Sequence, residues 1–199
     1  CTSRPIKAVL PGPYTFMRMS EDQYYKAPRP FALKMAEILN AEALALAQAG
    51  ATFIQFDEPA LAVGKPDVTL ALEALGIATK GVKAKTAVYT YFGSPNGVLE
   101  PLLRAKVDVI GLDVVSAPAL LTRLKRTKIT KELAIGCLDA RNTKLESVSA
   151  VQSLIRAVNK LVPSDRLYLN PNCGLEFLPH AQALAKVRRL VEAARATRT

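Results

Sequence analysis

Short apolar runs alternate along the chain with longer segments in which apolar residues recur at helical spacing. Strands that are buried on both faces have continuous apolar sequences, so the runs are typical of a parallel sheet. They predict strands at residues 6–10, 52–56, 86–91, 107–112, 133–138 and 166–169. The remaining segments predict helices at residues 30–49, 68–75, 98–105, 118–126, 147–161 and 179–195. Gly50 directly follows the longest helix and suits its C-terminal end.

The strict alternation of strands and helices predicts a parallel sheet that is covered by helices. Two architectures satisfy it, an open doubly wound sheet and a (β/α)₈ barrel. Open nucleotide-binding sheets usually carry a glycine-rich turn after their first strand, whereas this chain has Pro11-Gly12-Pro13-Tyr14-Thr15 there. A barrel typically needs ~250 residues, so in a chain of 199 residues about two strand-helix units would be missing at the N-terminus.

Polar side chains follow every predicted strand at its C-terminal end. In parallel α/β folds these ends form the rim of the active site. Asp and Asn also favour loop starts and helix caps for local reasons, but the coincidence at six strand ends predicts a convergent site. The groups are Gly12-Pro13-Tyr14-Thr15, Asp57-Glu58-Pro59, Tyr91-Phe92-Gly93-Ser94, Asp113, Asp139-Ala140-Arg141-Asn142 and Asn170-Pro171-Asn172-Cys173-Gly174.

Asp57 and Glu58 are adjacent carboxylates at the end of a strongly apolar strand. Successive side chains on a strand point to opposite faces, so at most one of the two would face the axis of a barrel if the strand geometry persists. That carboxylate would be poorly hydrated and would need a cationic partner, such as the ammonium of a substrate or an Arg.

The composition is that of an ordinary globular protein, with 50% hydrophobic and 22% charged residues. No apolar run approaches the ~20 residues of a membrane span. The formal net charge is +10, but the basic residues are spread along the chain and no aromatic residues interleave with them. We therefore expect a solvated basic surface rather than a nucleic-acid site, with an anionic ligand or partner as the alternative.

Three cysteines at distant positions form no disulfide framework, which favours a reducing, cytoplasmic location. Cys137 lies inside a predicted strand and is expected in the core. Cys173 lies in a loop next to Gly174, where it is either a small buried apolar residue or a thiolate or metal ligand. The single histidine, His180, is expected at the surface, at a helix start.

Three segments carry a resemblance to a known family. They are Leu10-Pro11-Gly12-Pro13-Tyr14-Thr15, Ile54-Gln55-Phe56-Asp57-Glu58-Pro59-Ala60-Leu61 and Asn170-Pro171-Asn172-Cys173-Gly174-Leu175. Together they resemble the cobalamin-independent methionine synthases, over about residues 5–194; the uroporphyrinogen decarboxylase-like barrels fit less well. The resemblance implies a (β/α)₈ barrel whose later six strand-helix units form one partial domain, residues 1–199.

The same resemblance implies an activity and a set of small molecules. The family transfers a methyl group from methyl-tetrahydrofolate to the thiol of homocysteine, and a bound zinc ion activates that thiol. This chain would accordingly take part in methionine biosynthesis, with homocysteine as substrate and a folate-like compound or a corrinoid as methyl donor. Zinc coordination deprotonates a thiol near neutral pH, which gives the physical reason for the metal.

Carried over residue by residue, the resemblance assigns roles to particular side chains. Cys173 matches the last zinc cysteine, and Asp113 falls on the zinc glutamate. The family's His-x-Cys pair falls on Tyr89 and Tyr91, and its proton-donating histidine falls on Arg141. Asp57 matches the carboxylate that holds the amino group of homocysteine. We therefore expect Asp113 and Arg141 as catalytic residues, Cys173 and Asp113 as metal ligands, and a substrate site at Asp57, Glu58, Tyr14, Thr15, Tyr91 and Asn142.

Tyr is a poor zinc ligand, so the tyrosines at positions 89 and 91 also support a second hypothesis. In it, the chain is a catalytically inactive barrel that binds a folate-like or amino-acid ligand or supports a partner barrel. Either a missing N-terminal segment or such a partner would cover the sheet edges that six strands alone leave exposed.

Overall fold

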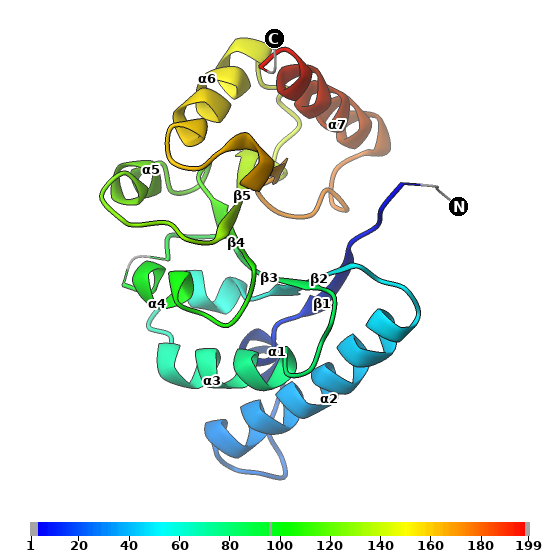
Figure 1. Ribbon diagram of the computed structural model, residues 1–199. Helices are drawn as coiled ribbons and strands as arrows, with labels where there is room; N and C mark the ends of the chain where they lie inside the picture. The colour runs from blue at the N-terminus through cyan, green and yellow to red at the C-terminus, as the bar shows by residue number, and fades with distance from the viewer. Residues whose placement is uncertain (1–3, 96, 198–199) are drawn as a thin grey trace. The chain divides into compact units, whose positions relative to one another are not determined.

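Strands and helices alternate along the chain in the computed structural model, which describes residues 4–95 and 97–197 (Figure 1). The strand order is β1-β2-β3-β4-β5-β6, so each strand lies beside the next one in the sequence. An open doubly wound sheet reverses its strand order part-way, whereas sequential order is that of a (β/α)₈ barrel. The elements are β1 (Ala8–Pro11), α1 (Pro13–Met19), α2 (Pro28–Gln48), β2 (Phe53–Asp57), the 3₁₀ helix η1 (Pro59–Ala62), α3 (Val68–Ala78), β3 (Lys85–Thr90), α4 (Leu99–Leu103), β4 (Val109–Asp113), α5 (Ala119–Leu124), β5 (Glu132–Leu138), α6 (Val148–Asn159), the 3₁₀ helix η2 (Ser164–Arg166), β6 (Leu167–Pro171) and α7 (His180–Arg195).

The chain divides into two compact units. Unit 1 comprises Cys1–Thr90 and Pro95–Ile110, and unit 2 comprises Tyr91–Ser94 and Gly111–Thr199. The prediction of one partial barrel domain over residues 1–199 stays a prediction, and each unit is described by itself below.

In unit 1, β1, β2 and β3 pair in parallel, with Leu10 beside Phe56 and Phe56 beside Val88. Side chains on one face of these strands are buried against helices, as in the case of Ile54 and Phe56, which have no exposed surface. The helices α1 and α3 pack against α2, the longest helix of the unit (Figure 1). The Asp67 carboxylate caps α3 by accepting a hydrogen bond from the Leu70 amide at 3.0 Å.

In unit 2, β5 and β6 pair in parallel, with a register irregularity between Gly136 and Leu138. A Cβ atom on Gly136 would lie 2.5 Å from the Asn172 Cα atom, so only glycine allows this approach of the backbones. Helices α6 and α7 pack on each other (Figure 1), and the Ser147 hydroxyl caps α6 through the Ala150 amide. Cys137 is buried in β5, as predicted.

The sequence predicted the six strands and the helices α2 to α7, with boundaries that differ by at most three residues. The predicted stop at Gly50 is confirmed, since its φ of +100° is one that glycine adopts readily. Helix α1 was not predicted, because Pro11-Gly12-Pro13 reads as a turn. It forms because Pro13 fits a first helical position and because a distant carboxylate binds its free amide groups.

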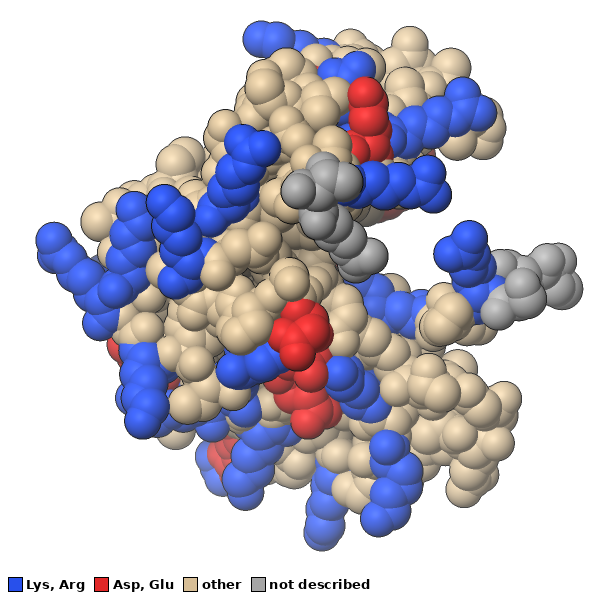
Figure 2. Space-filling model, turned by 45° about the horizontal axis from the view of Figure 1, so that its top comes forward, with Lys and Arg blue, Asp and Glu red and all other residues tan. Residues whose placement is uncertain are grey.

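Basic side chains are spread over the face shown in Figure 2, whereas the acidic ones are gathered in a few places. No helix among the described residues is both long enough and apolar enough to cross a membrane.

Candidate functional site

Glu58, one of the two predicted strand-end carboxylates, is fully buried. Its oxygens accept hydrogen bonds from the Tyr14 amide (2.9 Å), the Thr15 amide (2.7 Å) and the Thr15 hydroxyl (2.6 Å). Gly12 leaves the space for it, since a Cβ atom there would lie 2.1 Å from the Glu58 carboxyl carbon. Burial raises the pKa of Glu58 to about 7, although these hydrogen bonds lower it. Glu58, Tyr14 and Thr15 thus bind one another, and their contact with a substrate stays a prediction.

Asp57 has other partners than Glu58, as expected for successive residues at a strand end. Its register partner in β3 is Tyr89, and its carboxylate accepts a hydrogen bond from the Gln55 side-chain amide at 2.6 Å. Lys7 lies on the same face of the sheet as this pair, with its ammonium 4.5 Å from the centre of the Tyr89 ring and 3.3 Å from its hydroxyl. A cation and a carboxylate therefore share this face with an aromatic ring.

The sequence analysis did not identify Lys7 as a functional residue. Its side chain is exposed overall, yet desolvation of the ammonium lowers the pKa of Lys7 more than the nearby Asp57 carboxylate raises it. The one available signal was a Lys in the otherwise apolar run Ile6-Lys7-Ala8-Val9-Leu10. A charged residue there indicates that one face of the strand meets polar partners.

Unit 2 contains a pocket of about 480 Å³ at the carboxyl ends of β5 and β6, within the size range of small-molecule sites. Two predicted site residues, Arg141 and Cys173, line it. The Arg141 guanidinium carbon lies 5.3 Å from the centre of the Phe92 ring, in cation–π range. Tyr91 packs edge-on against Phe92, with 4.6 Å between ring centres. The other lining residues are Ala140, Gly174, Glu176 and Phe177.

Asp113, the predicted site residue at the end of β4, is 1% exposed, and both of its carboxylate oxygens accept hydrogen bonds. One carboxylate oxygen accepts hydrogen bonds from the amides of Val115 (3.1 Å) and Ser116 (2.8 Å). The other accepts one from the Asn172 side chain at 3.3 Å. Asn172 in turn accepts a hydrogen bond from the Ala140 amide at 2.9 Å, so it ties the loop after β5 to Asp113.

The loop after β5 is held together by its own polar groups. The Asp139 carboxylate accepts hydrogen bonds from the Arg141 amide (2.8 Å) and from the Asn142 side chain. Asn142 in turn accepts one from the Lys144 amide at 2.9 Å. Asn142, predicted to bind substrate, therefore lies in the loop that carries Arg141, but it is absent from the pocket lining given above.

The residues expected to hold zinc do not form a metal site. Within residues 4–95 and 97–197, no group of three or more His, Cys, Asp or Glu side chains is placed to bind a metal ion. Both Asp113 oxygens are used by other donors, and the Tyr89 hydroxyl accepts a hydrogen bond from Lys7. Burial, with Asp113 and Glu176 nearby, raises the pKa of the Cys173 thiol to about 11 in the metal-free chain.

Comparison with known proteins identifies the family. Residues 1–196 match the family described as cobalamin-independent synthase, catalytic domain. The chain belongs to this family. It is 34% identical to the methionine synthase of Saccharolobus solfataricus over 194 residues, which are 97% of this chain and 58% of that protein. It is 31% identical to that of Pyrococcus furiosus over 197 residues, 99% of this chain and again 58% of the relative.

Comparison with solved structures supports the same family. A B12-independent methionine synthase from Shewanella sp. W3-18-1, determined in complex with selenomethionine, superposes with a TM-score of 0.91 at 30% identity. The match covers 99% of this chain and 63% of that one. A methyltransferase from Methanosarcina mazei shares the fold alone, with a TM-score of 0.66 at 15% identity over 96% of this chain and 60% of that one. The chain is thus a six-strand part of a barrel of the methionine synthase type, and it spans 58% of the curated relatives it matches.

Proposed function

We propose that the protein containing this chain transfers a methyl group to the thiol of homocysteine and so forms methionine. The observation that carries the proposal is the close structural match to the Shewanella protein, which was determined with selenomethionine, the selenium analogue of the product. The methyl donor is methyl-tetrahydrofolate or a methylated corrinoid. A cytoplasmic location fits the unpaired Cys137 and Cys173.

Each unit of the chain supplies a charged residue that suits a group of a substrate. Asp57 accepts the ammonium group of homocysteine, because it lies at a strand end with its carboxylate toward the polar face of unit 1. Arg141 presents its guanidinium to the pocket of unit 2, where a carboxylate or another anionic group of a substrate binds. No step is assigned to a metal ion, since the donor set described above does not fit zinc.

The test is direct measurement of methionine. The complete protein is incubated with homocysteine and each methyl donor in turn, and methionine is quantified by mass spectrometry. We expect product with at least one donor, and a several-fold higher KM for homocysteine in Asp57→Asn, with a smaller change in kcat. Asp165→Asn, in η2, is the matched control and leaves KM unchanged. An intact protein that forms no methionine with either donor would refute the proposal.

The second candidate is a family barrel that binds an amino-acid or folate-like ligand without catalysis. It is favoured by the tyrosines at positions 89 and 91, where the resemblance places zinc ligands. Zinc analysis of the purified complete protein separates the two candidates. Stoichiometric zinc that is lost in Cys173→Ala would exclude the non-catalytic reading, whereas calorimetric binding of homocysteine without zinc and without turnover would support it.

A further inference from the structure

Lys186 is a fully buried lysine on α7 that does not line the pocket. Its ammonium donates hydrogen bonds to the Lys144 carbonyl (2.5 Å) and to both carboxylate oxygens of Glu146 (3.1 and 2.9 Å). The Lys186 side chain is 1% exposed and that of Glu146 is 23% exposed. Lysine is almost never fully buried unless it is paired, so the site is built around this ion pair.

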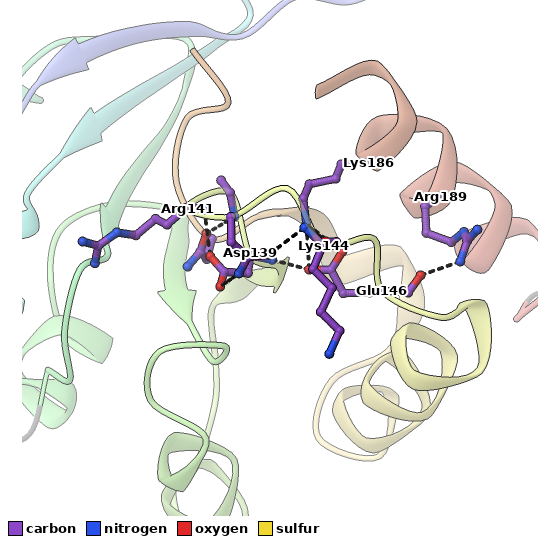
Figure 3. Close-up of polar contacts among 9 residues, drawn as sticks. Asp139, Arg141, Lys144, Glu146, Lys186 and Arg189 are labelled. Atoms are coloured by element: carbon purple, nitrogen blue, oxygen red, sulfur yellow. Dashed lines mark hydrogen bonds and ion pairs between the residues drawn. The ribbon is translucent and has the colours of Figure 1, made fainter. Parts of the chain in front are cut away.

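Glu146 also contacts the loop that carries Arg141. One of the two Glu146 oxygens, Oε1, also accepts a hydrogen bond from the Asp139 backbone amide at 2.7 Å. Asp139 then binds the Arg141 amide through its side chain. Figure 3 shows the network between α7 and the loop, with the Arg141 side chain pointing away from it. A continuous series of polar contacts therefore joins the Lys186 ammonium to the backbone of Arg141.

The loop is fixed from two sides. Lys186 and Arg189 hold its far end from α7, the latter by a hydrogen bond to the Glu146 carbonyl. Asn172 holds its near end through the Ala140 amide. Arg141 lies between these attachments and is exposed, so its own side chain supplies little restraint beyond its contact with Phe92.

We propose that Lys186 is a positioning residue, which holds Arg141 at the pocket through Glu146 and Asp139. The inference deepens the proposed function, because it rests on Arg141 as the group that binds an anionic part of the substrate. Its test does not depend on methyl transfer, so the two can fail separately. A purely structural anchor of α7 would stabilise the fold without changing the electrostatic field inside the pocket.

The labelling rate of Cys173 can measure the electrostatic field inside the pocket, because Cys173 lines this pocket and is only partly buried. Two disulfide reagents are compared on the complete protein, the dianionic nitrothiobenzoate disulfide and neutral dithiodipyridine. Labelling at Cys173 is followed by peptide mass spectrometry, which separates it from the other cysteines. Both reagents react with the same thiolate, so the ratio of their rates cancels changes in thiolate population and reports the charge near the thiol, to which Arg141 contributes.

We expect Arg141→Met to lower the anionic-to-neutral rate ratio by about fivefold or more at low salt, as expected for one unit of the reagent's charge about 4 Å from the guanidinium in water. Lys186→Met should lower it most of the way to the Arg141→Met value. The difference from the unmodified protein should shrink at high salt, because an exposed charge is screened there. Lys160→Met, which removes an exposed lysine at the end of α6 in the same unit, should leave the ratio unchanged.

A second variant covers the case in which an unpaired Glu146 prevents Lys186→Met from folding. Lys186→Met combined with Glu146→Met leaves no buried charge without a partner, yet it still removes the acceptor of the Asp139 amide. Folding of each variant is checked by circular dichroism. The double variant removes one positive and one negative charge, so a low ratio in it does not come from the lost charge of Lys186 itself. A folded single or double variant with the ratio of the unmodified protein would overturn the proposal, and a double variant with a ratio near that of Arg141→Met would support it.

Discussion

Glu58 should make the stability of unit 1 depend on pH in a direction opposite to that of most carboxylates. Its pKa is raised from an ordinary value of 4.5 to about 7 in the folded chain, chiefly by burial. Between these pH values the unfolded chain has already released the proton that the folded chain keeps, so the free energy of unfolding falls as pH rises. The contribution is fully present below about pH 4.5 and is lost by about pH 7, and its size is about 3 kcal/mol.

The assay compares urea unfolding of the unmodified chain and of Glu58→Gln, followed by circular dichroism at several pH values across this window. The amide cannot ionise, and it turns a donor toward one of the amides of Tyr14 and Thr15, so the variant is already less stable at low pH. The stability advantage of the unmodified chain should therefore shrink by about 3 kcal/mol from pH 4.5 to 7. Glu42→Gln, an exposed carboxylate on α2, is the control and should show a constant difference. A constant difference for Glu58→Gln, or one that grows with pH, would refute the reasoning.

Three further substitutions test close contacts in the two units. Gly12→Ala should lower the free energy of unfolding by about 2 kcal/mol or more in urea titrations, because its Cβ atom would meet the buried Glu58 carboxyl group. Gly136→Ala should cost a similar amount, since the obstacle is the Asn172 backbone; an unchanged urea midpoint would contradict either prediction. Asn172→Asp places a second carboxylate against buried Asp113, so its loss of stability should be larger at about pH 8 than at about pH 5. Equal losses at both pH values would show that the two groups do not interact.

The inner strands β2 to β5 could be predicted because they are apolar and mostly buried, and β1 and β6 because their sequences are apolar although they are only partly buried. The helix ends could be predicted because Gly50, Asp67 and Ser147 act locally. Helix α1 could not, since its free amide groups are satisfied by Glu58, 43 and 44 residues further along the chain. A local reading of Pro11-Gly12-Pro13 finds only a turn. The helix is a consequence of tertiary contact, which a pattern of neighbouring residues does not contain.

In the candidate site, too, the features that depend on local geometry could be predicted, and those that depend on distant partners could not. Alternation along β2 predicts different surroundings for Asp57 and Glu58, and the two carboxylates do have different hydrogen-bond partners. Lys7 and Lys186 were not identified, because a lysine in an apolar run or on a helix is ordinarily a solvated residue. Their importance comes from partners elsewhere in the chain, Tyr89 for the first and Glu146 for the second.

The tyrosine at position 89 illustrates how a substituted site acquires other contacts. The resemblance places a zinc ligand there, but Tyr89 turns its ring toward the Lys7 ammonium, and its hydroxyl accepts a hydrogen bond from the same group. Asp113, at a second ligand position, gives both carboxylate oxygens to amide donors. A zinc ion would have to displace these contacts as well as find its remaining ligands. The departure from the family's ligand set therefore extends to the partners of the substituted residues, and reverting one position alone would not rebuild the metal site.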